Sequence, residues 1–150
     1  AELHFAATHD PLTRLRNRRA LLDDLGQLLQ ERRPATFALL DVHGMRRFND
    51  AHGHLAGDAL LVDLAARLEA AILGHGHVYR LAGVQLCGLI LSDPEAVVAA
   101  ACKALSTADR AVGCRAVTVE IPREATTVAA VLRLADERLA GYGNVATAGA

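Results

Sequence analysis

The chain has 150 residues, of which 52% are hydrophobic and 22% charged, so it can bury the core of one ordinary domain. Sixteen Lys and Arg residues stand against seventeen Asp and Glu residues, and this balance excludes the basic footprint of a nucleic-acid-binding domain. No stretch approaches the roughly 20 apolar residues that a membrane-spanning helix needs. Three cysteines without metal-ligand spacing favour a cytoplasmic location, within a larger protein that could be membrane-attached elsewhere.

The predicted elements begin with helices. Residues 1–10 have mixed apolar character and no cap, which indicates the end of a helix entering from an upstream segment. The pair Asp10-Pro11 is a helix-start signal, because Asp can cap and Pro is tolerated at the first helical position. Asn17 is a second candidate cap, and leucines recur at helical spacing after it. They predict a helix that continues to about Arg33.

Short strands and further helices are predicted for the rest of the chain. Asp41 lies near the end of the first strand, and Gly83 supplies the turn of a β-hairpin. Gly141 should end the last helix, and residues 143–150 should form a disordered tail. Without a repeat or linker, the pattern predicts a single α/β domain. The expected elements are a strand over residues 36–42, a helix over 55–73, a hairpin of 78–81 and 86–91, a helix over 94–108, a strand over 116–121 and a helix over 127–140.

Three segments carry motifs that together resemble one family, the GGDEF (diguanylate cyclase) domains. They are similar, in order and spacing, to that family's N-terminal motif, its D-x-D-x-F-K-x-x-N-D stretch with trailing G-H and G-D, and its R-x-G-G-D/E-E-F signature. The segments are His9-Asp10-Pro11-Leu12-Thr13 with Asn17-Arg18-Arg19, then Asp41-Val42-His43-Gly44-Met45-Arg46-Arg47-Phe48-Asn49-Asp50 with Gly53-His54 and Gly57-Asp58, then Arg80-Leu81-Ala82-Gly83-Val84-Gln85-Leu86.

The resemblance implies an α+β fold with a central, mostly antiparallel sheet flanked by helices, related to the palm of polymerases and to nucleotide cyclases. Residues 1–10 would be the end of an incoming signalling helix, and residues 11–142 a degenerate GGDEF domain. The signature is degenerate because Ala-Gly-Val-Gln-Leu stands where GGDEF or GGEEF is expected.

Cyclases of this family join two GTP molecules, and metal ions held by carboxylates neutralise the charge of the transition state. The resemblance implies Asp41 as one metal carboxylate. Val84 stands at the second metal position, Gln85 replaces the neighbouring acid, and His43 replaces a third acid. With one carboxylate of three retained, no catalytic residue is expected, and we predict that the chain is not an active cyclase.

The positions implied in nucleotide binding are better preserved. Asn49 and Asp58 match the pair that hydrogen-bonds guanine, Arg46 replaces a phosphate-contacting Lys, and Gly83 keeps its place in the signature. An alternative stays open, in which Asn49 caps or turns a loop and Asp58 begins the long helix. Gly143 stands where the family has a second phosphate-contacting Lys, so binding of a triphosphate is expected to be weaker.

Other binding features of the sequence are weak. The pairs His52/His54 and His75/His77 lack a third and fourth ligand, so zinc is not expected. Residues 73–76 replace the family's R-x-x-D product-inhibition motif, so feedback binding of cyclic di-GMP is not expected there.

Three functions remain open. The preferred one is a catalytically inactive regulatory or dimerisation module in cyclic di-GMP signalling, whose partners are a second copy or an attached sensor or phosphodiesterase domain. This function requires no cofactor. The alternatives are a GTP-binding sensor that controls an attached domain and a weakly active diguanylate cyclase, and both would take GTP with Mg²⁺.

Overall fold

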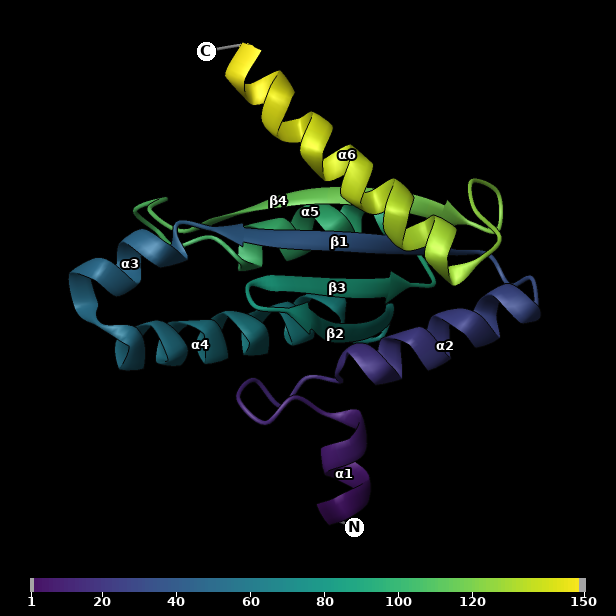
Figure 1. The fold of residues 1–150 in the computed structure, drawn as a ribbon, viewed down its shortest axis with the longest axis horizontal. Coiled ribbons are helices and arrows are strands. Elements are labelled where there is room, and N and C mark those ends of the chain that lie inside the picture. The colour runs from purple at the N-terminus through teal and green to yellow at the C-terminus, as the bar shows by residue number, and fades with distance from the viewer. Residues whose placement is uncertain (1, 149–150) are drawn as a thin grey trace.

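A computed structural model of the chain describes residues 2–148, and the side chains of residues 5–142, as one sheet with helices on both faces (Figure 1). Alternating and helical apolar patterns build these layers, because each strand and helix must bury its apolar face. The helices are α1 (Glu2–Thr8), α2 (Arg18–Gln30), α3 (Met45–His52), α4 (His54–Ile72), α5 (Pro94–Ala104) and α6 (Val128–Ala148). The strands are β1 (Ala35–His43), β2 (Gly76–Ala82), β3 (Gln85–Ile90) and β4 (Gly113–Ile121).

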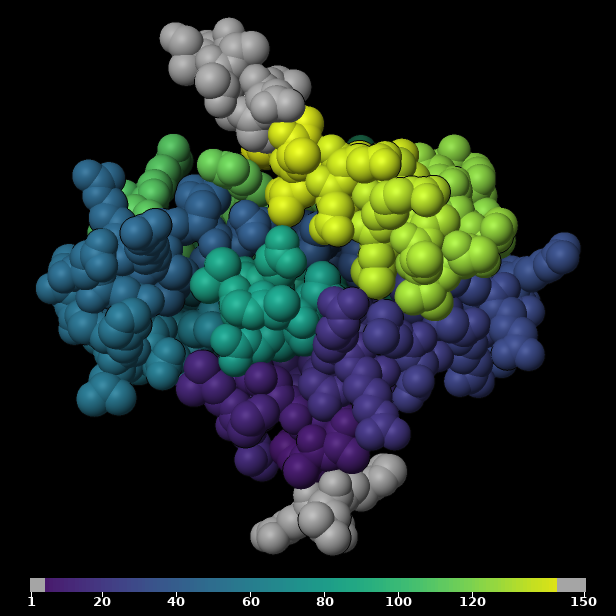
Figure 2. Space-filling view, viewed as in Figure 1, coloured from purple at the N-terminus to yellow at the C-terminus, as the bar shows by residue number. Residues whose placement is uncertain are grey.

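The four strands lie in the order β2-β3-β1-β4, and each neighbouring pair is antiparallel. This arrangement confirms the predicted antiparallel sheet and the predicted hairpin. The β2–β3 turn and the end of β1 lie at the same end of the sheet, next to α3 (Figure 1). In the space-filling view the teal hairpin lies at the surface between the blue α3–α4 region and the yellow-green α6 (Figure 2).

β1 divides the core into two layers. Its first six residues are all buried, and successive side chains point to opposite faces of the sheet. Phe37 and Leu39 pack with α2 and α6, whereas Ala38 and Leu40 pack with α4 and α5. Buried on both faces, β1 reads as a continuous apolar run, which is why its sequence shows no alternation.

The start of α2 corrects one predicted boundary. Asn17 caps this helix, since its side chain accepts a hydrogen bond from the amide of Ala20. The helix start predicted at Asp10-Pro11 is wrong, because the Asp10 carboxylate instead accepts the amide hydrogen bond of Thr13 and closes a turn. The helix ends at Gln30, three residues before Arg33.

The sequence also missed α3 and misplaced the end of α6. α3 is an eight-residue helix between Gly44 and Gly53, both of which have positive φ angles. α6 continues through Gly141 to Ala148, so the helix end predicted there is wrong. The predicted tail overlaps α6 as far as residue 148, and residues 149–150 lie outside the described residues. Within the described part, no helix is long and apolar enough to cross a membrane.

Candidate functional site

The C-terminal end of β1 holds Asp41 between two partner strands. The Cα of Asp41 pairs with that of Gln85 on β3 and that of Arg115 on β4. Residues directly opposite each other in antiparallel strands point to the same face, so all three side chains share the face that carries Phe37 and Leu39. All three are partly exposed. A neutral amide and a guanidinium group therefore flank the Asp41 carboxylate, beyond the end of the hydrophobic core.

The tip of the β2–β3 hairpin places Val84 beside the same strand end. Gly83 takes a φ of 50° in the left-handed region that favours glycine. The carbonyl of Val84 accepts a hydrogen bond from the amide of Val42, at 3.1 Å. The Val84 side chain is half-buried against the core layer under α4 and α5. The position implied for a second metal carboxylate is thus filled by hydrocarbon that packs into the core.

The donors at this end of the sheet do not suit the family's magnesium site. Mg²⁺ prefers oxygen ligands and takes one or two carboxylates with phosphate oxygens and waters. Asp41 offers one carboxylate, Val84 offers no ligand atom, and Arg115 brings positive charge to the same face. The ring of His43 lies over Gly113 on β4. Among the described residues, no three His, Cys, Asp or Glu side chains gather into a metal-binding group.

Asn49 and the start of α4 form the second part of the candidate site. The side-chain oxygen Oδ1 of Asn49 is buried and has no hydrogen-bond partner. It lies against Gly57 on α4, where an added Cβ would clash with it. Gly57 therefore makes room for the amide. An unpaired buried acceptor is costly, and a ligand N–H that reached it would remove that cost.

Arg46 and Asp58 lie close to Asn49 along the chain. Arg46 is exposed and lies three residues before Asn49 on α3, which puts both on one side of the helix. Asp58 follows Gly57 on α4 and is also exposed. The alternative that Asp58 begins the long helix is wrong, because α4 begins at His54. The alternative that Asn49 caps or turns a loop is also wrong, because Asn49 lies inside α3 and its backbone carbonyl accepts the amide of Gly53, which ends that helix, at 2.7 Å.

The N-terminal motif is bonded to the hairpin signature. The Asp10 carboxylate accepts hydrogen bonds from the amide and hydroxyl of Thr13, both at 2.8 Å, and from the guanidinium of Arg80 at 3.0 Å. Arg80 also donates to the carbonyl of Gly83, at 3.0 Å. Burial alone would raise the pKa of Asp10, but the bonds from Thr13 and Arg80 outweigh it and lower that pKa. One guanidinium thus joins two distant motifs.

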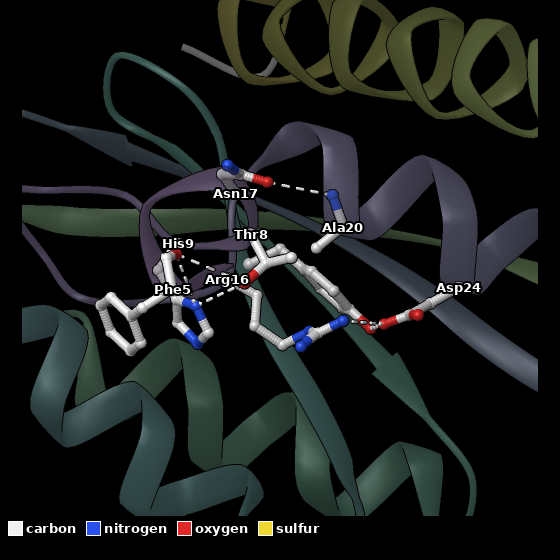
Figure 3. Close-up of polar contacts among 8 residues, drawn as sticks. Phe5, Thr8, His9, Arg16, Asn17, Ala20 and Asp24 are labelled. Atoms are coloured by element: carbon white, nitrogen blue, oxygen red, sulfur yellow. Dashed lines mark hydrogen bonds and ion pairs between the residues drawn. The ribbon is translucent and has the colours of Figure 1, made fainter. Parts of the chain in front are cut away.

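A second network connects α2 with β2 (Figure 3). The buried Tyr79 donates its hydroxyl hydrogen bond to the carboxylate of Asp24, at 2.6 Å. Arg16 pairs with the same carboxylate at 3.1 Å. Burial and the nearby Asp24 raise the pKa of Tyr79, so its hydroxyl stays a donor. The carbonyl of Arg16 accepts the amide of Arg80, at 2.8 Å, and this bond fastens the loop to β2.

Asn17 fastens α1 to the rest of the domain. Its amide nitrogen Nδ2 donates to the carbonyl of Ala7, at 3.1 Å. Its oxygen Oδ1 caps α2 by accepting from the amide of Ala20 (Figure 3). The ring of Phe5 on α1 stacks on that of His9, the residue that follows the helix, at a centroid distance of 3.7 Å. The same asparagine therefore holds the end of one helix and the start of the next.

The structure brings together several residues that the sequence singled out. Asp41 lies by strand register next to Gln85, and Asn49 lies next to the Gly57-Asp58 step. Arg115 was not foreseen, because its place opposite Asp41 depends on strand register. Gly143 lies in α6 beyond the described side chains. The ligand roles of Asp41, Asn49, Asp58, Arg46 and Gly83 stay predictions.

An antiparallel sheet with helices on both faces, and the signature hairpin beside the end of β1, define an α+β domain of the palm type. The family model described as "Diguanylate cyclase, GGDEF domain" matches residues 7–142. The chain belongs to this family, which connects it with cyclic di-GMP signalling proteins.

Relatives of known name come from other bacteria. The bifunctional diguanylate cyclase/cyclic di-GMP phosphodiesterase MucR of Pseudomonas aeruginosa is 41% identical over 93 residues, which cover 59% of this chain and 14% of MucR. Diguanylate cyclase DgcN of Escherichia coli is 36% identical over 112 residues, which cover 71% of this chain and 27% of DgcN. The chain therefore spans about a quarter or less of the length of these relatives.

Among solved structures, diguanylate cyclase SiaD of Pseudomonas aeruginosa, in complex with its activator SiaC, has a TM-score of 0.84 at 27% identity. The match covers 96% of this chain and 61% of that one. The coiled coil and GGDEF domain of DgcB from Caulobacter crescentus, in complex with c-di-GMP, has a TM-score of 0.81 at 20% identity and covers 95% of this chain and 84% of that one. The second likeness shows the fold alone.

Proposed function

We propose that this chain is a GGDEF domain that makes no cyclic di-GMP and acts as a regulatory or dimerisation module in cyclic di-GMP signalling. The observation that carries the proposal is the half-buried Val84 side chain, packed into the core at the position of a metal carboxylate. Formation of a phosphodiester from two GTP molecules needs metal ions to neutralise the charge that develops on phosphate. Asp41 is a single carboxylate opposite the positively charged Arg115, so it would bind those metal ions weakly.

A continuous path of bonds supports the regulatory part of the proposal. Asn17 holds the last turn of α1, and the adjacent Arg16 bonds to the backbone of β2 at Arg80. Arg80 in turn holds both the N-terminal motif at Asp10 and the hairpin tip at Gly83. A movement of α1 would therefore be passed to the signature hairpin, where a second copy or an attached domain could respond to it.

A turnover assay tests the inactive state. Concentrated protein is incubated with GTP and either Mg²⁺ or Mn²⁺, and the nucleotides are separated by chromatography. An intact GGDEF cyclase run in parallel shows that the assay works, and the Asp41→Ala variant reports contaminating enzyme. We expect no more cyclic di-GMP from the chain than from this variant. Product that disappears in Asp41→Ala would support the weakly active cyclase instead and would overturn the proposal.

A GTP-binding sensor is the second candidate, and the unpaired Oδ1 of Asn49 favours it. Guanine presents N–H donors along its edge, and a buried amide oxygen without a partner is suited to accept one of them. Occupancy would act by favouring one conformation of an attached domain. Calorimetric titration with GTP in the presence of Mg²⁺ tests this function. No heat of binding at millimolar GTP would remove it and leave the module without a nucleotide.

A further inference from the structure

Two of the three thiols in the chain lie together between α5 and β4. Cys102 is on α5 and Cys114 is at the start of β4, and both are partly exposed and free. Sγ of Cys102 donates a hydrogen bond to the carbonyl of Cys114, at 3.4 Å. Cys87 is different, because it is fully buried in the layer under α2 and α6.

The contact makes the two sulfurs chemically unequal. The Cys114 side chain lowers the pKa of Cys102 to about 7, against an opposing effect of burial. The Cys102 side chain, together with burial and the nearby Asp41 carboxylate, raises the pKa of Cys114. A thiolate, not a thiol, is the nucleophile in sulfur chemistry. Cys102 is therefore the attacking sulfur, and Cys114 stays a protonated thiol.

We propose that Cys102 and Cys114 are a thiol modification site that a peroxide oxidises to a reversible intramolecular disulfide. The Cys102 thiolate attacks one oxygen of hydrogen peroxide, an S–O bond forms as the O–O bond breaks, and hydroxide leaves and takes up a proton as water. The sulfur of Cys114 then attacks the sulfenic acid on Cys102. An S–S bond forms as the S–O bond breaks, and a second water leaves with the thiol proton of Cys114. Two thiols lose two electrons, and one peroxide becomes two waters.

The surrounding fold already brings the two cysteines together. The two cysteines are 12 positions apart in sequence, and the loop between them is already held by hydrogen bonds. The carboxylate of Asp109 accepts bonds from the Thr107 hydroxyl at 2.6 Å and from the Ala111 amide at 3.0 Å. Because the ends of the loop are already together, closing it costs little further ordering. The bond would tie α5 to β4.

The position of the pair makes the modification relevant to the candidate site. The Cα of Cys114 pairs with that of Val42, which follows Asp41 in β1. Oxidation would thus fix the strand that forms one side of the site. The disulfide itself does not depend on cyclase activity or on GTP binding.

Mass spectrometry tests the proposal on the whole chain. Fully reduced protein is treated with hydrogen peroxide and then with N-ethylmaleimide, and a non-reducing digest is analysed. We expect loss of two of the three alkylatable thiols, a monomer lighter by two hydrogen atoms before alkylation, and one peptide pair that joins Cys102 to Cys114. Dithiothreitol should restore both thiols. A pair that contains Cys87, or oxidation that yields only covalent dimers, would overturn the proposal.

Single variants assign the two roles. Cys114→Ala should leave a sulfenic acid on Cys102 that dimedone labels, whereas Cys102→Ala should prevent the fast oxidation altogether. Cys87→Ala is the matched control and should form the disulfide as the parent chain does. If dimedone labels Cys114 in Cys102→Ala as fast as the parent chain is oxidised, the assignment of the two roles is wrong. The parent chain's cross-linked peptide decides the main proposal even where a variant fails to fold.

Discussion

The amide oxygen of Asn49 is the atom on which the nucleotide proposal depends most, since it is buried without a partner beside Gly57. Asn49→Ala removes this acceptor, and we expect GTP affinity to fall about tenfold, as one lost hydrogen bond of about 1.4 kcal/mol implies. Isothermal titration calorimetry measures the change. Asp50→Ala, at the next and exposed position of α3, is the control. Equal losses in both variants would mean that the amide oxygen does not contact the base.

The single hydroxyl group of Tyr79 should contribute measurably to the stability of the fold. Its hydroxyl is bonded to the Asp24 carboxylate at 2.6 Å inside the protein. Tyr79→Phe keeps the ring and removes this bond, so we expect the free energy of unfolding to fall by about 1.5 kcal/mol. Urea denaturation followed by circular dichroism measures it. Tyr142→Phe, at a residue that is 45% exposed, should change little, and a similar loss there would contradict the explanation.

Residues that belong to local motifs could be predicted from the sequence, and residues that meet through the fold could not. Asp41, Asn49 and Val84 were found because their motifs have fixed spacing. Arg115 and Cys114 carry no such pattern. Their positions beside Asp41 and Cys102 follow from the register of β4 on β1, and a shift of one residue would turn each to the other face.

At the scale of single elements, Asn17 connects α1 to α2 through two different atoms. Asn17→Asp keeps the oxygen that caps α2 but loses the nitrogen that donates to Ala7, whereas Asn17→Ala loses both. We expect Asn17→Ala to lower the free energy of unfolding by about 1 kcal/mol and Asn17→Asp to cost less. Both should speed amide hydrogen exchange in α1. Unchanged exchange in Asn17→Asp would show that the bond to Ala7 does not hold α1.

Elements with strong apolar periodicity were predicted well, and the misses have physical causes. α3 is short, largely polar and flanked by Gly44 and Gly53, so its sequence resembles a loop. The helical form is held by tertiary contacts, because Met45 is buried and Phe48 packs against the core layer under α4 and α5. α6 passes through Gly141 because one glycine costs a helix only about 1 kcal/mol.

On the scale of the whole molecule, two carboxylates hold parts of the fold that are distant in sequence. Asp10 joins the N-terminal motif to the hairpin through Arg80. Glu124 accepts two hydrogen bonds from Arg138 on α6, at 2.9 and 2.7 Å, and one from the backbone amide of Glu120, at 2.8 Å. The bonds from Arg138 and from the amide lower the pKa of Glu124 to about 2.

These lowered pKa values predict how stability changes in acid. A carboxylate whose pKa is lower in the folded state stabilises the fold above its unfolded pKa, and this stabilisation is lost as the pH falls through the folded pKa. For Glu124 the loss runs from about 4.3, the unfolded value, down to about 2. For Asp10, whose pKa is also lowered, it begins at about 3.9. We expect stability to be flat above about pH 5 and to fall steeply below pH 4.

Variants separate this linkage from general acid unfolding. The difference in unfolding free energy between the parent chain and Glu124→Gln should be largest near neutral pH and should shrink as the pH approaches the folded pKa of about 2. The difference in unfolding free energy between the parent chain and Asp10→Asn should also shrink as the pH falls, but it should begin to shrink at a lower pH than the difference for Glu124→Gln. Asp63→Asn removes an exposed ion pair with Arg67 and serves as the control, with little effect at any pH because such pairs contribute about 0–1 kcal/mol. Urea titrations at several pH values measure all three differences. A Glu124→Gln difference that stays constant down to the lowest pH would mean that Arg138 does not hold this carboxylate in the folded protein.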